Sequence, residues 1–228
     1  MKREIIITSD GSTTVHLPDW NEQYHSKHGA IQEAYHVFIK NGLETISNTQ
    51  INILEIGLGT GLNCFITFLE AQKNLKYIDY TGVEAYPIQN DELEKLNFVA
   101  KLEATKHMAI FDKIHQSSWN KKHEITSNFI LTKRKQFFSD INDENYFDLI
   151  YFDAFGARVQ PELWTETIFL KMFNALKFNG VLVTYSAKGS VRRAMESVGF
   201  LVERLPGPPR KREMLRATKK TIIIPLKP

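Results

Sequence analysis

The chain has 228 residues, of which 43% are hydrophobic and 24% charged, with a formal net charge of +3 and one cysteine, Cys64. This length suffices for one sizeable core and is short for two, and a single cysteine excludes an intramolecular disulfide. No window reaches the roughly 18 consecutive apolar residues of a membrane span, and MKREIIITSD lacks the features of a secretory signal, so we expect a cytoplasmic protein with no membrane partner.

The charge is distributed unevenly along the chain. Residues 192–228 carry ten Lys or Arg and three Glu, a local balance of +7, which leaves −4 for residues 1–191. A basic segment at one end is typical of a surface that meets a polyanion such as nucleic acid. Basic runs are also common on simply solvated surfaces, so the charge alone leaves both interpretations open.

The N-terminal segment predicts a small extension. REIIITSD and STTVHL are short β-rich runs around an Asp10-Gly11 pair, which indicates a two-stranded hairpin. Over residues 28–40 the apolar side chains recur at helical spacing and predict a helix. We expect residues 1–48 to form an N-terminal hairpin and helix packed on a globular domain of residues 49–228.

From residue 51 onward, segments with strand and helix patterns alternate. The predicted strands are 51–56, 77–84, 147–153 and 180–186, and the predicted helices are 60–72, 88–104, 161–176 and 189–197. This alternation predicts an α/β fold, a mostly parallel sheet with helices on both faces. Two more strands, FLVERL and TIIIPL, are expected to form a closing antiparallel hairpin whose connection carries GPPRKREMLRATKK.

A glycine-rich turn follows the first of these strands in INILEIGLGTGLN. Gly57, Gly59 and Gly61 have the spacing G-x-G-x-G, and no Lys-Ser or Lys-Thr follows, which argues against a triphosphate loop. A dinucleotide or S-adenosylmethionine would both need such a close approach to the backbone. Glu55, just before the turn, is placed to favour the sulfonium and amino charges of S-adenosylmethionine.

Acidic residues also end two later strands. Glu84 lies where an acid receives ribose hydroxyls in both cofactor classes, so it does not choose between them. Asp153 ends the buried run FDLIYFD, with Phe155 close behind. A carboxylate there can orient an amine and help to remove its proton, while an aromatic wall shapes the pocket. This pair favours N-methylation over hydride transfer.

Several separate stretches together resemble the methyltransferase domain of the MnmC-type tRNA wobble-uridine modification enzymes. The resemblance covers residues 9–217 and rests on YHSKHGAIQEAYHVF at 24–38, EIGLGTGLN at 55–63, FSDI at 138–141, DAFGARVQPELW at 153–164, SAKGSVRR at 186–193 and RKREML at 210–215. It implies a Rossmann-like class I S-adenosylmethionine-dependent methyltransferase with a mostly parallel seven-stranded sheet.

The resemblance also implies a reaction and its site. The reaction is N-methylation of the 5-aminomethyl group of a wobble uridine, usually 2-thiolated, giving 5-methylaminomethyl-(2-thio)uridine. Asp153 would lie at the target amine with Phe155, Asp140 beside the adenine after a strand QFFS, and Tyr24 with Gln32 and Glu33 would close the cofactor pocket. The implied cofactor contacts are Tyr24, Gln32, Glu33, Glu55, Gly57, Gly59, Gly61, Asn63, Glu84, Asp140 and Asp153.

A partner for the basic end follows from the same resemblance. The partner would be the anticodon stem-loop of a tRNA, with its wobble base splayed into the pocket. Its phosphates would be held by Arg192, Arg193, Arg210, Lys211 and Arg212. Because the chain ends at Pro228, it is similar to the standalone form without a fused flavin-dependent oxidase domain. We therefore expect no FAD, and a separate enzyme or the cell itself would supply the aminomethyl substrate.

Two other function classes remain open at this point. The same fold could serve a small-molecule amine methyltransferase or an aminopropyltransferase, and a catalytically silent RNA-binding protein could retain it. A nicotinamide dehydrogenase is a more distant alternative. His25 and His28 lie in no ligand set of recognised spacing, so no metal site is expected.

Overall fold

The computed structural model describes residues 2–220. Its N-terminal part is a small antiparallel sheet of β1 (Glu4–Ile7), β2 (Thr13–Leu17) and β3 (Glu22–Gln23). Ile5 pairs with Val15 across β1 and β2, so the predicted hairpin is confirmed.

The helix predicted over residues 28–40 forms in two parts. α1 (Ala30–Ala34) continues directly into a π-helical turn, Tyr35–Lys40, and a 3-10 turn, Leu43–Thr45, follows. Asp10 at the tip of the hairpin accepts hydrogen bonds from the backbone N–H groups of Ile31 (3.1 Å) and Gln32 (3.3 Å). The hairpin thereby satisfies amide groups that the first turn of a helix leaves without partners.

The rest of the chain is built on one mixed sheet. Its strands are β4 (Gln50–Ile56), β5 (Tyr77–Val83), β6 (Lys122–Thr126), β7 (Phe129–Arg134), β8 (Phe147–Phe152), β9 (Leu176–Thr184), β10 (Phe200–Pro206) and β11 (Glu213–Lys219). Their spatial order is β10-β11-β9-β8-β4-β5-β7-β6. The inner strands β9, β8, β4, β5 and β7 run parallel, and β6, β10 and β11 add antiparallel pairs at the two edges.

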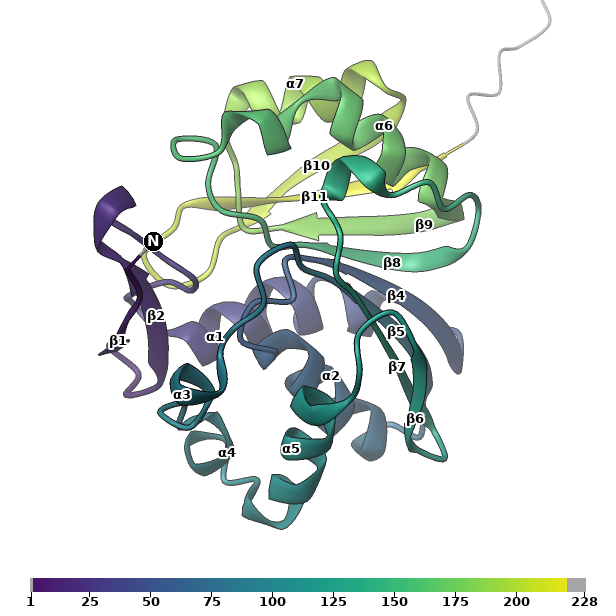
Figure 1. Ribbon diagram of the computed structural model, residues 1–228. Helices are drawn as coiled ribbons and strands as arrows, with labels where there is room; N and C mark the ends of the chain where they lie inside the picture. The colour runs from purple at the N-terminus through teal and green to yellow at the C-terminus, as the bar shows by residue number, and fades with distance from the viewer. Residues whose placement is uncertain (1, 221–228) are drawn as a thin grey trace, which may run out of the picture.

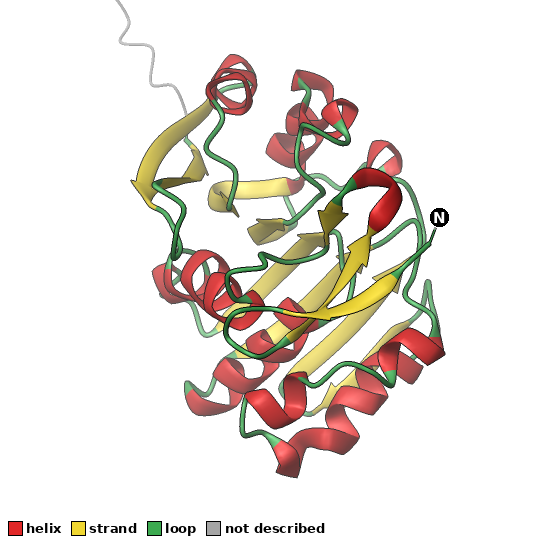
Figure 2. Cartoon of the chain, turned by 90° about the vertical axis from the view of Figure 1, so that its left-hand side faces the viewer, coloured by secondary structure: helices red, strands yellow, loops and turns green. Residues whose placement is uncertain are grey.

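Helices cover both faces of this sheet, as expected for an α/β fold (Figures 1 and 2). In Figure 1, α6 and α7 lie on one side and α1, α2 and α5 on the other, while β1 and β2 lie beside the sheet at the left. The helices after α1 are α2 (Leu62–Lys73), α3 (Asn90–Leu93), α4 (Phe98–Lys101), α5 (Met108–Gln116), α6 (Glu166–Ala175) and α7 (Gly189–Ser197).

Side-chain alternation along β4 divides the core between the two faces. Ile51 and Ile53 belong to the cluster that contains the buried side chains of α2, whereas Leu54 and Ile56 belong to the cluster of α6 and α7. Alternate residues of a strand point to opposite faces. Glu55 therefore points to the same face as Ile51 and Ile53, toward α2.

The sheet differs from the seven strands expected from the sequence. Within residues 2–220 the sheet has eight strands. Two of them, β6 and β7, were not predicted, and the predicted strand QFFS does not form, since it lies in the segment after β7. The closing strand β11 is EMLRATK, which was expected to be connection, while the predicted strand TIIIPL lies outside the described residues. The helix predicted over 88–104 is two short helices, because Asn97 between them bonds to the hairpin residues Thr13 and Gly11. Within residues 2–220, no helix combines the length and apolarity needed to cross a lipid bilayer.

Candidate active site

A large cavity opens where the inner strands end. It has a volume of about 1390 Å³ and lies against the ends of β4, β5 and β8 and the N-terminal sheet. This is the position at which open α/β sheets bind ligands. Pockets for one small molecule commonly measure roughly 300–1,000 Å³, so this cavity has room for a cofactor and part of a second substrate.

The glycine turn forms the floor of the cavity. Gly57, Gly59 and Gly61 have φ angles of +90°, +50° and +72°, a region that favours glycine. A Cβ atom at Gly57 would lie 2.7 Å from the carbonyl oxygen of Asp153, and one at Gly59 would lie 3.1 Å from the ring of Tyr24. These two glycines thus allow the strand end and the N-terminal segment to close onto the turn.

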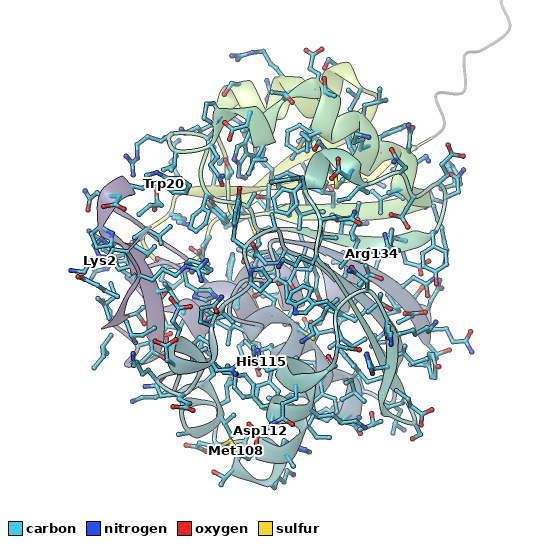
Figure 3. All side chains as sticks on the ribbon, in the orientation of Figure 1. Lys2, Trp20, Met108, Asp112, His115 and Arg134 are labelled. Carbon is cyan, nitrogen blue, oxygen red and sulfur yellow. The ribbon has the colours of Figure 1, made fainter. Side chains whose placement is uncertain are left out.

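Gly61 faces the other side of the turn. A Cβ atom there would lie 3.0 Å from the ring of His115 on α5, and Gly61 does not line the large cavity. Figure 3 shows His115 toward the middle of the molecule, while Met108 and Asp112 of the same helix lie at its edge. Gly61 makes room for His115, and the expected cofactor contact at this glycine stays a prediction.

Asp153 and Glu55 are bridged by the side-chain amide of Asn63. Asn63 Nδ2 donates to Asp153 Oδ2 (2.8 Å) and to Glu55 Oε1 (2.9 Å). Tyr80 donates its hydroxyl to Glu55 Oε2 (2.8 Å). Asn63 Oδ1, which is buried, accepts no hydrogen bond from the described residues. The two carboxyl groups orient the amide of Asn63, a residue that lines the cavity.

Glu55 does not reach the cavity, contrary to the expectation that it would face the cofactor's positive charges. Its side chain points toward α2, it is only 1% exposed, and Asn63 and Tyr80 cover it. Burial raises its pKa well above the ordinary value, although the hydrogen bonds from Tyr80 and Asn63 oppose that shift. Burial thus favours the protonated form of Glu55, whose side chain supports Asn63 from below the cavity wall.

Asp153 lines the cavity, and the pKa of its carboxyl group lies near neutral pH. Burial raises its pKa to about 7, the Asn63 hydrogen bond lowers it, and the charges of Glu33 and Lys211 act in opposite directions. Its backbone N–H donates to Ile56 (2.9 Å), which anchors the residue beside β4. A group that changes charge near pH 7 suits proton transfer.

An aromatic cluster forms one wall of the cavity. Phe155 is met edge-on by Trp20 (5.8 Å between ring centroids) and by Tyr24 (5.1 Å). Trp164 Nε1 donates to the Phe155 carbonyl oxygen (2.7 Å), which holds the loop in place. Burial raises the pKa of Tyr24 to about 12, so its phenol stays neutral. Trp20, labelled in Figure 3, was not predicted, because it lies in the extension rather than next to a strand of the main sheet.

Glu84 is held at the opposite side of the glycine turn. It accepts hydrogen bonds from the backbone N–H groups of Gly59 (3.1 Å) and Tyr86 (2.9 Å). Tyr86 and Phe137 form an exposed aromatic pair with ring centroids 6.2 Å apart, and both line the cavity. This rim was not predicted, because QFFS, which contains Phe137 and Phe138, was expected to be a strand.

Besides Glu55 and Gly61, three more of the expected cofactor contacts do not line the cavity. Asp140 is exposed at the end of a 3-10 turn whose preceding residues, Phe137, Phe138 and Ser139, line the cavity instead. Gln32 is exposed on α1, and Glu33 forms an ion pair with Lys211 (2.6 Å). Asp140 ends a 3-10 turn instead of following the expected strand, and the cofactor contacts of these three residues stay predictions.

The five basic residues assigned to tRNA divide into two groups. Arg193, Arg210 and Arg212 are exposed and form no ion pair within residues 2–220. Arg192 pairs with Glu196 (3.3 Å) on the same helix, and Lys211 turns inward to Glu33. Arg193, Arg210 and Arg212 are thus the more accessible members of the predicted phosphate-binding set, while Lys211 is engaged with Glu33.

The side chains of the cavity fit S-adenosylmethionine. Glu84, at the rim of the cavity, can receive ribose hydroxyls. Tyr86 and Phe137 offer apolar faces to an adenine. Among the described residues there is no group of His, Cys, Asp and Glu arranged to hold a metal ion.

Comparison with known families gives one family match. The model of a family described as S-adenosyl-L-methionine-dependent methyltransferase matches residues 89–220.

Curated relatives agree with this family and differ in length. The chain is 30% identical over 214 residues to the tRNA 5-methylaminomethyl-2-thiouridine biosynthesis bifunctional protein MnmC of Leptospira borgpetersenii, covering 86% of this chain and 32% of that protein. It is 27% identical over 228 residues to the protein of the same name from Cupriavidus metallidurans, covering 92% and 33%. The chain thus spans about a third of the length of these relatives.

Solved structures show the same fold. MnmC2 from Aquifex aeolicus is 22% identical, with a TM-score of 0.74 over 96% of this chain and 71% of that chain. Spermidine synthase from Thermotoga maritima is 14% identical, with a TM-score of 0.53 over 94% and 72%. At these identities the likeness concerns the fold alone.

Proposed function

This chain belongs to the S-adenosyl-L-methionine-dependent methyltransferase family, and from that premise we propose that it N-methylates the 5-aminomethyl group of a (2-thio)uridine at the wobble position of tRNA. The product is 5-methylaminomethyl-(2-thio)uridine. The observation that carries the proposal is Asp153, a carboxyl group poised near neutral pH at the wall of a cavity large enough for a nucleoside beside the cofactor.

Asp153 prepares the amine for methylation. An aminomethyl group is mostly protonated at neutral pH and cannot attack until a nitrogen lone pair is free. Asn63 occupies Asp153 Oδ2, and Oδ1 has no donor among the described residues, so Oδ1 can accept the ammonium proton and orient the nitrogen. When bound, S-adenosyl-L-methionine supplies an electrophilic methyl group on its sulfonium.

The aromatic cluster selects a flat substrate. Trp20, Tyr24 and Phe155 line the cavity on the side of Asp153. Bases splayed from single-stranded RNA commonly stack on such side chains. The names of the relatives support this substrate class, since each refers to 5-methylaminomethyl-2-thiouridine in tRNA.

The exposed arginines supply a surface for the anticodon stem-loop. Arg210 and Arg212 lie on the loop between β10 and β11, and Arg193 lies on α7. Phosphate contacts of this kind position an RNA without reading its sequence. A separate enzyme would supply the aminomethyl-uridine, because methylation requires that primary amine to exist already.

The role of Asp153 is tested with Asp153→Asn, which keeps the size of the side chain. We expect it to bind S-adenosyl-L-methionine by calorimetry with little change and to lose methyl transfer to tRNA by about 10²- to 10⁴-fold. Full activity in this variant would remove Asp153 from the mechanism. Transfer to free polyamines but not to tRNA in the parent protein would replace the proposed substrate with a small amine.

A further inference from the structure

The loop between β10 and β11 sends neighbouring basic side chains in opposite directions. Its backbone is closed by hydrogen bonds from Gly207 N–H to the Arg212 carbonyl (3.1 Å) and from Lys211 N–H to the Pro208 carbonyl (2.9 Å). Arg210 and Arg212 are exposed, whereas Lys211 is directed toward the body of the protein. The loop therefore combines an outward basic surface with one inward ammonium group.

Lys211 lies close to the segment that carries Asp153, through its contact with Tyr185. Its Nζ lies 2.6 Å from Glu33 Oε2 on α1 and 4.1 Å from the centre of the Tyr185 ring. The Glu33 side chain is only 12% exposed. Tyr185 donates its hydroxyl to the carbonyl oxygen of Ala154 (2.8 Å), the residue after Asp153. The ion pair thus lies next to the segment of Asp153, with Glu33 nearly covered and the Lys211 side chain 32% exposed.

Both charges of this pair act on Asp153, and in opposite senses. Glu33 raises the pKa of Asp153 and Lys211 lowers it. The other titratable groups around Asp153 are Glu55, reached through Asn63, and the phenol of Tyr185, whose hydroxyl is committed to Ala154. Burial raises the pKa of Glu55 and of Tyr185, which favours the uncharged form of each.

We propose that Glu33 and Lys211 are positioning residues of the methyl-transfer site whose opposite charges set how readily Asp153 holds a proton. Lys211 then serves the active site, while its neighbours Arg210 and Arg212 serve the RNA surface. The inference rests on the proposed function only in taking Asp153 as the group that accepts the amine's proton.

The test titrates Asp153 directly in the cofactor-free protein. With ¹³C-labelled aspartate carboxyl carbons, the Asp153 resonance is assigned by its loss in Asp153→Asn, and its midpoint is followed against pH. Lys211→Met should raise the midpoint by about one pH unit and Glu33→Gln should lower it by about one. The double variant should return close to the parent value, because both charges are then absent.

Opposite shifts distinguish charge balance from a purely structural role. Shifts of the same sign in both single variants, or no shift in either, would overturn the proposal. Arg204→Met is the matched control, since it breaks the Arg204–Glu213 ion pair (3.0 Å) on the same hairpin and should leave the midpoint in place. Circular dichroism confirms that each variant is folded before its titration is interpreted.

Methyl-transfer assays separate this inference from the proposed function. If the parent protein methylates no tRNA while the titration shifts as expected, the charge pair stands and the assigned substrate fails. If tRNA is methylated and the midpoints do not move, the substrate stands and the charge pair fails. With both intact, the acid limb of kcat should move with the midpoint in each variant.

Discussion

At the scale of single residues, the central feature is a carboxyl group kept near its point of ionisation. Burial raises the pKa of Asp153 to about 7, while Asn63 limits that rise. Below this pH Asp153 is protonated and cannot accept a proton from the amine. We expect kcat for methyl transfer to rise with pH through about 7 and this limb to disappear in Asp153→Asn. A profile that is flat between about pH 6 and about pH 8 would contradict the assignment.

The buried Glu55 gives a second prediction at this scale. Because the pKa of Glu55 is raised in the folded state, the folded protein holds this proton at pH values where the unfolded chain has lost it. The contribution of Glu55 to stability is therefore complete at low pH and decreases as the pH rises. Glu55→Gln imitates the neutral acid and removes this decrease. Urea unfolding should show that Glu55→Gln gains stability relative to the parent protein between about pH 5 and about pH 9. A relative loss over that range would mean that Glu55 is ionised.

At the scale of elements, the N-terminal hairpin is fastened to the helix that follows it. Asp10 accepts hydrogen bonds from Thr8 (2.7 Å), Ser12 (3.0 Å), Ile31 (3.1 Å) and Gln32 (3.3 Å). Asp10→Ala removes the helix cap and leaves these donors unpaired, so it should cost about 1–2 kcal/mol of unfolding free energy by urea titration. Asp91→Ala, at an exposed ion pair, is the control and should cost much less; equal losses would contradict the capping role.

Elements with a clear repeat were predictable, and those that depend on tertiary contacts were not. The strand β4, the glycine turn and α2 follow from local pattern, as does β8 with Asp153 at its end. The hairpin β6–β7 and the strand β11 gain their partners only from the assembled sheet. The same holds for the site: Asp153 and Glu84, which local pattern places at strand ends, line the cavity. Tyr24 lines it too, but only the resemblance pointed to that residue.

The misplaced site residues share a physical cause, which is side-chain direction. The alternation along β4 puts Glu55 on the α2 face together with Ile53, a result that the sequence could have supplied by strand parity alone. Lys211 is different. Its inward direction depends on Glu33 and Tyr185, which lie far away in the chain, so no local pattern distinguishes it from Arg210 and Arg212.

At the scale of the whole molecule, the methyltransferase cavity is accompanied by an exposed basic loop that we propose to contact RNA. Arg210 and Arg212 are exposed on one loop, and each phosphate that they neutralise should make binding more salt-dependent. Log Kd for tRNA should rise with log salt by about 0.7 to 0.9 per phosphate contact. Arg212→Met should weaken binding and reduce that slope by about one contact, as measured by filter binding over a salt series. An unchanged slope with unchanged affinity would place the RNA on another surface.

The most direct measurement of the central claim follows the methyl group itself. Labelled S-adenosyl-L-methionine is incubated with the protein and with tRNA that carries 5-aminomethyl-2-thiouridine but lacks the final methyl group, and the tRNA is digested to nucleosides. The account predicts label in 5-methylaminomethyl-2-thiouridine and in no other nucleoside. Label in a different nucleoside, or none in tRNA while the cofactor still binds, would contradict it.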